Sequence, residues 1–137
     1  MSIKRTICLV LSIVIVTVST LTMTVNANIK PPANTQWYGT SSVHFSLSKD
    51  SGTTYITTCI AGDSTVTKIE ATTQLYIIGA HGALIKIGNS NYHCVDSFNL
   101  DVADKYYNLA DGRYYATLSA TVHCPSGTDN ISTYDVN

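Results

Sequence analysis

The sequence predicts an all-β protein, an antiparallel β-sandwich of seven or eight short strands that follows an export signal. Three observations support this fold class. After residue 27 the chain is dominated by Thr, Val, Ile and Tyr, which alternate with polar residues as in half-buried strands. Clusters of Gly, Asn, Asp and Ser separate these runs. No stretch after residue 27 has the apolar period of a long amphipathic helix.

The first 27 residues have the composition of a Sec-type signal peptide. Lys4 and Arg5 precede the apolar run 7–16, and small residues lead to Ala27, after which we expect cleavage. A retained membrane anchor is the alternative. However, a span needs about 20 predominantly apolar residues, and Ser and Thr interrupt the second half of this segment. The sequence therefore predicts a secreted, extracellular protein with no stable membrane span after cleavage.

The remaining chain is long enough for one domain. We expect an extended N-terminal arm over residues 28–41, because Pro31 and Pro32 cannot donate to a strand ladder. Trp37 is expected to pack over the edge of the core from this arm. The sandwich domain then covers residues 42–137.

Charge narrows the classes of partner. Loss of Lys4 and Arg5 with the signal removes two cations and no acid, so the formal net charge changes from −1 to −3. The mature chain has no basic cluster. These features argue against nucleic acid, and also against an anionic membrane surface, as partners.

Two strands are expected at the start of the domain. In the run 42–48, Val43, Phe45 and Leu47 alternate with polar residues, which places them on one face. The turn 49–52 then leads into a second strand over 53–61.

The longest candidate strand covers residues 65–78, after a turn at 62–64. A helix over 68–76 is the alternative, which the β-branched content disfavours. One side of the strand carries a regular set of mainly apolar residues, namely Ile69, Ala71, Thr73, Leu75 and Ile77.

Glycine-bounded turns are predicted at residues 79–82 and 88–91, and they lead into strands over 83–87 and 92–98. A strand over 99–107 and a turn over 108–112 follow. The remaining strands are a long one over residues 113–124, which Pro125 ends, and an edge strand over 130–136.

The stretch 109–114, "LADGRY", resembles the tyrosine corner of immunoglobulin-like and fibronectin type III-like sandwiches. The resemblance implies that Tyr114, just after a turn containing Asp111 and Gly112, bonds its hydroxyl to upstream backbone. In immunoglobulins the second cysteine lies two residues after this tyrosine, and here that position is Ala116. The usual inter-sheet disulfide is therefore not expected, although the architecture is.

The run 109–122, "LADGRYYATLSATV", and the Ser-Gly-Thr turn after it are also similar to small secreted proteins of Gram-positive bacteria. In those proteins a signal peptide precedes a domain rich in Ser, Thr and Tyr, with a late Gly-x-Tyr-Tyr strand. This resemblance implies a location and a fold but no activity.

Three cysteines remain after the signal. Alternation places Cys94 and Cys124 on the core side of their strands and Cys59 on the outward side. We therefore expect a Cys94–Cys124 disulfide, which would contribute roughly 3–4 kcal/mol in the chain-entropy model. A pairing that involves Cys59, or three reduced thiols, are the alternatives.

No metal or cofactor is expected. His93 and His123 each precede a cysteine, but neighbours on a strand point to opposite faces, so neither His-Cys pair can chelate. The spacing of a structural zinc site is also missing. We interpret these histidines as outward strand residues, His44 as another, and His81 as a turn residue.

No feature of the sequence predicts an enzyme. A cysteine nucleophile would need a histidine base beside it, and no histidine is near Cys59 in sequence. The acids Asp96, Asp101, Asp104 and Asp111 match no calcium motif, so solvated turn acids are the interpretation.

Tyrosine is the residue type that favours binding. The chain has 9 Tyr. Alternation places Tyr76, Tyr115 and either Tyr106 or Tyr107 outward, where they would offer contact area and a hydrogen-bonding tip to an extracellular glycan or protein. The simpler interpretation is that half of the tyrosines pack between sheet and loops. The sequence thus favours a secreted binding module. The alternatives are a non-catalytic structural or cell-surface protein that pairs through a free edge strand and, less favoured, a toxin- or bacteriocin-like factor.

Overall fold

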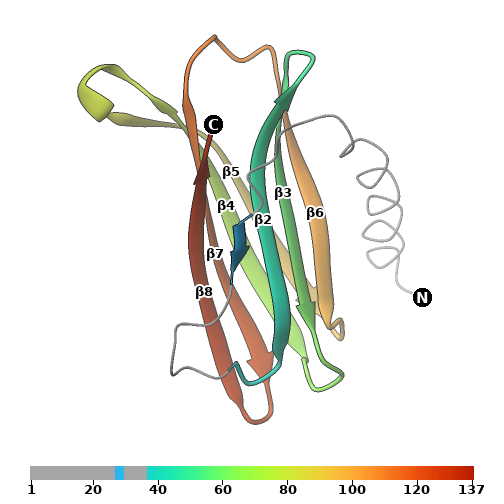
Figure 1. Ribbon diagram of the computed structural model, residues 1–137. Helices are drawn as coiled ribbons and strands as arrows, with labels where there is room; N and C mark the ends of the chain where they lie inside the picture. Colours follow the sequence, from blue (N-terminus) through green and yellow to red (C-terminus); the bar gives the residue numbers. More distant parts are fainter. Residues whose placement is uncertain (1–26, 30–36) are drawn as a thin grey trace.

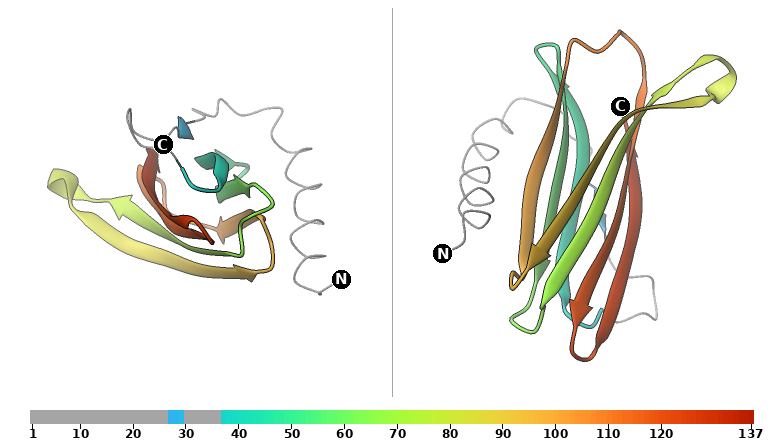
Figure 2. Two further views of the ribbon diagram at one scale, coloured as in Figure 1. Left: turned by 90° about the horizontal axis from the view of Figure 1, so that it is seen from below. Right: turned by 180° about the vertical axis from the view of Figure 1, so that it is seen from behind.

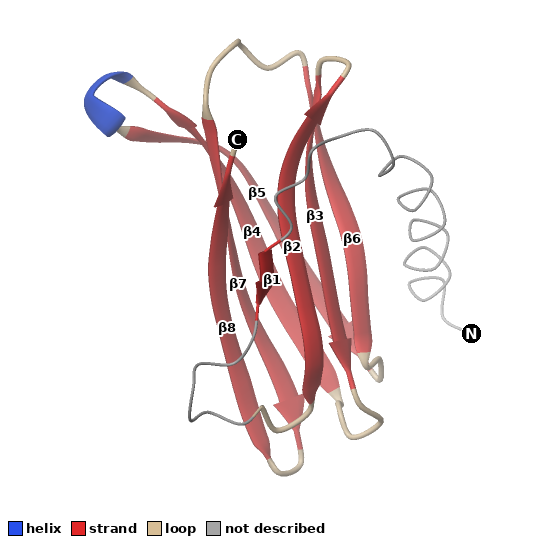
Figure 3. Ribbon diagram, in the orientation of Figure 1, coloured by secondary structure: helices blue, strands red, loops and turns tan. Residues whose placement is uncertain are grey.

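The computed structural model describes residues 27–29 and 37–137, so the predicted signal segment 1–26 and most of the arm lie outside the described residues. These residues form eight strands and one short 3₁₀ turn (Figures 1 and 3). The elements are β1 Ala27–Ile29, β2 Thr40–Asp50, β3 Thr53–Gly62, β4 Lys68–Ile78, η1 Ala80–Gly82, β5 Leu84–Val95, β6 Asn99–Tyr107, β7 Tyr114–Cys124 and β8 Gly127–Val136.

The strands make two antiparallel sheets, ordered β1-β2-β3-β6 and β5-β4-β7-β8. The sheets pack face to face, as Figure 2 shows from two further directions. The chain passes between them after β3, after β5 and after β6. This confirms the predicted antiparallel β-sandwich of the immunoglobulin and fibronectin type III type. No helix in the described part of the chain could cross a membrane.

The core lies between the sheets and follows the predicted alternation. Val43, Phe45 and Leu47 are buried on β2. The helix alternative is wrong, because residues 68–78 form β4, with every second side chain inward from Ile69 to Leu75. Trp37 packs against the core, as predicted.

Tyr114 makes the contact of a tyrosine corner. Its side chain is fully buried, and its hydroxyl donates a hydrogen bond to the backbone carbonyl of Ala110. The backbone N–H of Tyr114 donates to Oδ1 of Asn137 at 2.9 Å. Asp111 and Gly112 lie in the exposed loop that leads to Tyr114, where Asp111 Oδ1 is 3.4 Å from Lys49 Nζ. The corner thus fixes the start of β7 to the preceding loop.

Two carboxylates of β8 bind the backbone at the edge of β2. Buried Asp129 accepts from the N–H groups of Tyr38 (2.8 Å), Gly39 (3.1 Å) and Thr40 (2.9 Å), and from Thr40 Oγ1 (2.7 Å). Burial raises the pKa of Asp129, but these bonds outweigh it and hold the pKa below its usual value. Asp135 accepts from the Leu47 N–H at 2.8 Å. The edge of β2 is therefore joined to β8 at both ends.

The predicted turn at residues 88–91 is wrong, because β5 runs unbroken through it. A β-bulge opposite Leu75 and Tyr76 marks the place instead. A Cβ atom on Gly88 would lie 2.4 Å from Cε1 of Tyr106, which reaches across from the other sheet. This glycine therefore serves close packing between the sheets rather than a change of chain direction.

The predicted Cys94–Cys124 disulfide is also wrong, and none of the three described cysteines is in a disulfide. Both residues do pack against the core, as alternation predicted. However, Cys94 lies on β5 and Cys124 on β7, with β4 between them. Strands two positions apart are about 9–10 Å apart, whereas a disulfide needs Cα atoms within about 7 Å.

Candidate functional site

The candidate site is the outward side of sheet β5-β4-β7-β8, hereafter the outer face. Its side chains fall into three zones along the strands, which the strand register defines. The first zone is the tyrosine cluster of Tyr76, Tyr115 and Tyr134. The second is a polar strip of Thr72, Gln74, Asn89, Asn91, Thr117 and Ser119. The third is a charged group of Lys68, Glu70, His93 and His123.

The tyrosine cluster spans three neighbouring strands. The ring centroids of Tyr76 and Tyr115 are 6.0 Å apart, and those of Tyr115 and Tyr134 are 5.4 Å apart, with both pairs tilted. The hydroxyl of Tyr76 donates to Oε1 of Gln74 at 2.5 Å, which links the cluster to the polar strip. Tyr134 is 61% exposed, so part of this aromatic surface is open to solvent.

Of the four tyrosines predicted to bind, the structure brings two together, Tyr76 and Tyr115. Of the neighbours Tyr106 and Tyr107, Tyr106 is the one that faces inward and packs against the core, so its candidate role in binding is wrong. Tyr107 is exposed but lies on the other sheet, opposite Thr53. Tyr134 was not among the tyrosines predicted to face outward, although it lies two residues after Ser132 in β8 and alternation places both on the same side.

The polar strip carries paired amide and hydroxyl groups. Thr72 Oγ1 donates to Asn91 Oδ1 at 2.9 Å, and Gln74 Nε2 donates to Asn89 Oδ1 at 3.2 Å. A shallow depression of about 350 Å³ lies where the strip meets the charged group. Its lining residues are Glu70, Ala71, Thr72, Asn91, Tyr92, His93, Ser119 and Thr121.

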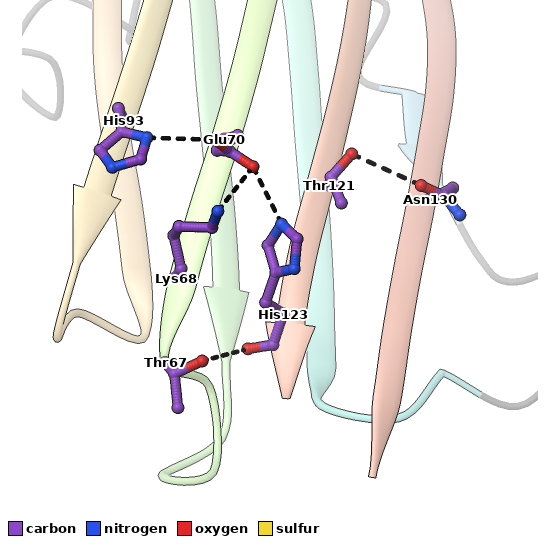
Figure 4. Close-up of polar contacts among 7 residues, drawn as sticks. All are labelled: Thr67, Lys68, Glu70, His93, Thr121, His123 and Asn130. Carbon is purple, nitrogen blue, oxygen red and sulfur yellow. Dashed lines mark hydrogen bonds and ion pairs between the residues drawn. The ribbon is translucent and has the colours of Figure 1, made fainter. Parts of the chain in front are cut away.

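Glu70 is the centre of the charged group, as Figure 4 shows. Its Oε1 lies 3.2 Å from Nδ1 of His93, and its Oε2 lies 2.9 Å from Nε2 of His123 and 3.1 Å from Nζ of Lys68. Lys68 first, and then His123, lower the pKa of Glu70. Both histidines face outward, as predicted. That both histidines contact one carboxylate could not be predicted without knowing the order of the strands.

Among the residues that the structure describes, no group of three or more His, Cys, Asp or Glu could hold a metal ion. In the charged group, the lysine and the two histidines surround both oxygens of the one carboxylate.

The other sheet brings a histidine and an acid beside Cys59. The register places His44 opposite Cys59 on one side and Asp101 opposite it on the other. Cys59 Sγ donates to Asp101 Oδ1 at 3.1 Å. Burial, together with this carboxylate, raises the pKa of the thiol to about 12. A cysteine nucleophile needs a thiolate, and this environment favours the neutral thiol.

Comparison with known proteins gives no evidence about the function of the chain. No protein-family model matches the chain, and no curated protein matches it either. Among solved structures, the chain is similar to the crystal structure of Parabacteroides merdae beta-glucuronidase, with 13% identity and a TM-score of 0.43. The match covers 69% of this chain and 13% of that enzyme's chain. A likeness of this size carries nothing about activity.

Proposed function

We propose that the chain is a secreted, non-catalytic binding module that holds a glycan on its outer face. One observation carries the proposal. Three tyrosine rings in contact adjoin a strip of amide and hydroxyl side chains on one side of a single sheet. Secretion rests on the signal-like composition of residues 1–27.

The chemistry of the two zones matches the two kinds of surface on a sugar. The C–H faces of a sugar ring pack on an aromatic ring, and its hydroxyl groups exchange hydrogen bonds with amides and hydroxyls. Strands about 4.8 Å apart present such groups in regular rows. A short oligosaccharide that lies on the tyrosine cluster can therefore extend over the polar strip.

A glycan suits this face better than a protein partner does. The buried centre of a protein interface is mainly apolar and aromatic. Here the centre of the outer face is the polar strip, whose members are Thr, Ser, Asn and Gln. Such a surface stays hydrated unless its ligand supplies many hydroxyl groups.

The charged group supports binding rather than hydrolysis. Glycosidases use a pair of carboxyl groups, one of them kept protonated. Glu70 is the only carboxylate among the outward residues of β4, β5, β7 and β8, and its pKa is lowered, which favours the ionised form. It can accept hydrogen bonds from sugar hydroxyls at the end of the depression.

Titration calorimetry against soluble polysaccharides, after a glycan-array screen, tests the proposal. Tyr115→Ala removes the central ring of the tyrosine cluster and is expected to weaken binding about tenfold or more. Tyr107→Ala is the matched control, because Tyr107 is exposed on the other sheet. Equal weakening by both variants, or no binding to any glycan, would refute the proposal. Intact mass of the exported chain tests secretion, with Asn28 as the expected first residue.

A further inference from the structure

The hairpin formed by the ends of β4 and β5, residues 77–87, projects beyond the body of the sandwich (Figures 1 and 2). We call it the hairpin arm. The tip is η1, and the flanking strands carry exposed aliphatic side chains: Leu84 is 50%, Ile85 56% and Ile87 40% exposed. These are three of the eight large hydrophobic side chains exposed in the described part of the chain.

The hairpin arm is apolar on both of its faces. Leu84 pairs with Ile78 and lies on the outer face, whereas Ile85 pairs with Ile77 and lies on the opposite one. Between residues 77 and 85, His81 at the tip is the only polar side chain. A partner that docks on the outer face alone would leave Ile85 exposed on the opposite face. Immersion in lipid covers both.

The tip satisfies much of its own backbone. The N–H of Gly79 donates to the carbonyl of Ala83 at 2.7 Å, and that of Gly82 donates to Gly79 at 3.2 Å. The N–H of Ala83 donates to Ala80 at 3.3 Å. An unpaired backbone group is costly in an apolar medium, so this internal bonding lowers the cost of moving the tip out of water.

Charge and aromatic residues around the hairpin arm fit a membrane surface. The hairpin arm itself carries no acid and one cation, Lys86. The loop that contains Asp111 and Arg113 lies at its base, where the Ile78 N–H donates to the Arg113 carbonyl at 2.9 Å. Lys86 lies opposite Tyr76, at the edge of the tyrosine cluster. Tyrosine favours the boundary between apolar and hydrated layers, and a lysine head can remain there while its stem is buried.

We propose that the hairpin arm inserts peripherally into the interfacial layer of a lipid bilayer. From Tyr76 to the tip at His81 is five residues, or about 15 Å if fully extended. Interfacial elements bury their apolar part about 5–10 Å deep. Leu84 and Ile85 pair with β4 residues between Tyr76 and the tip, so they reach the acyl boundary while Tyr76 stays at the level of the headgroups. The inserted residues 77–85 lie outside the tyrosine cluster and the polar strip, so the proposal does not rest on glycan binding.

The test is co-sedimentation of the exported chain with vesicles of mixed phosphatidylcholine and phosphatidylglycerol. The double variant Leu84→Ser, Ile85→Ser is expected to bind about tenfold more weakly or worse. The double variant Val95→Ser, Phe98→Ser is the control and should bind like the wild type, because Val95 and Phe98 are similarly exposed (54% and 49%) but lie outside the hairpin arm. Circular dichroism checks that both variants fold.

Amide hydrogen exchange of residues 79–83 should slow in the presence of vesicles. This measurement reports on the hairpin arm alone, separately from any contribution of the N-terminus to vesicle binding. The proposal is overturned if exchange there is unchanged, or if both double variants lose binding equally. It is also overturned if the hairpin variant abolishes a dimer seen by ultracentrifugation while no vesicles bind, because the arm is then an interface between copies. Glycan titration is independent of each of these outcomes.

Discussion

Replacing Asp129 with asparagine tests the carboxylate that joins β8 to the start of β2. Asparagine has the same shape but keeps only one acceptor oxygen. If that oxygen takes the place of Oδ2, the bonds from Gly39 and Thr40 are kept without the charge. The amide NH₂ group then faces the N–H of Tyr38, whose 2.8 Å bond is lost.

The magnitude follows from these four bonds. A hydrogen bond to a charged group contributes about 1.5–3 kcal/mol, and a neutral one about 0.5–1.5 kcal/mol. Losing one charged bond and weakening three others predicts that D129N lowers the free energy of unfolding by about 2–4 kcal/mol at neutral pH. Asn130→Ala is the control, because Asn130 is exposed and its side chain accepts a long bond of 3.4 Å from Thr121 Oγ1. It should cost less than about 0.5 kcal/mol.

Urea unfolding with two probes measures the effect. Far-ultraviolet circular dichroism follows the whole sandwich, and fluorescence of Trp37, the single tryptophan, follows the segment that Asp129 holds. Because the pKa of Asp129 is lowered on folding, its contribution is present above its ordinary value of 3.8 and is lost as the pH falls through the folded-state pKa. The difference between wild type and D129N should therefore shrink below about pH 4.

One result would refute this reasoning. If D129N unfolds at neutral pH within about 0.5 kcal/mol of the wild type, the four bonds do not stabilise the fold as described. A difference that stays constant from pH 7 down to pH 3 would show that the carboxylate charge is not responsible.

Four further predictions concern the packing of the core and the cysteines. Tyr114→Phe should lower the free energy of unfolding by about 1–2 kcal/mol, because the Ala110 carbonyl loses its partner; an unchanged urea midpoint would contradict this. Gly88→Ala should cost about 1–3 kcal/mol, since the new methyl group meets the ring of Tyr106; a melting temperature equal to that of the wild type would exclude that contact. The mature chain should have the same intact mass with and without reductant, because none of the three described cysteines is in a disulfide. Cys59 should react slowly with a thiol reagent at pH 8 until the chain is unfolded, because its pKa is about 12; fast reaction in the native state would show otherwise.

Alternation along single strands was sufficient to predict the fold class and most of the core. Val43, Phe45 and Leu47 face inward, and Cys94 and Cys124 also lie on the core side, because each property depends on one strand alone. Tyr114 could be predicted because the whole tyrosine corner lies within one short stretch of sequence.

Properties that depend on which strands are neighbours could not be predicted in this way. Alternation gives the side of the sheet on which Cys94 and Cys124 lie, but the position of β4 between them follows from topology. The same holds for Glu70, which meets histidines from two different strands. Gly88 shows a further limit, since a glycine in the sequence is equally consistent with a turn and with a close contact to a distant ring.

The bonds of Asp129 also bear on the order in which the chain folds. They join residues 89 to 91 positions apart, so β8 must be present before the backbone donors of residues 38–40 are satisfied. Contacts this distant in sequence form late and slow the approach to the native state. During synthesis, the emerging chain therefore keeps an incomplete seam along β2 until β8 arrives, and chaperones and proteases can reach it during that interval.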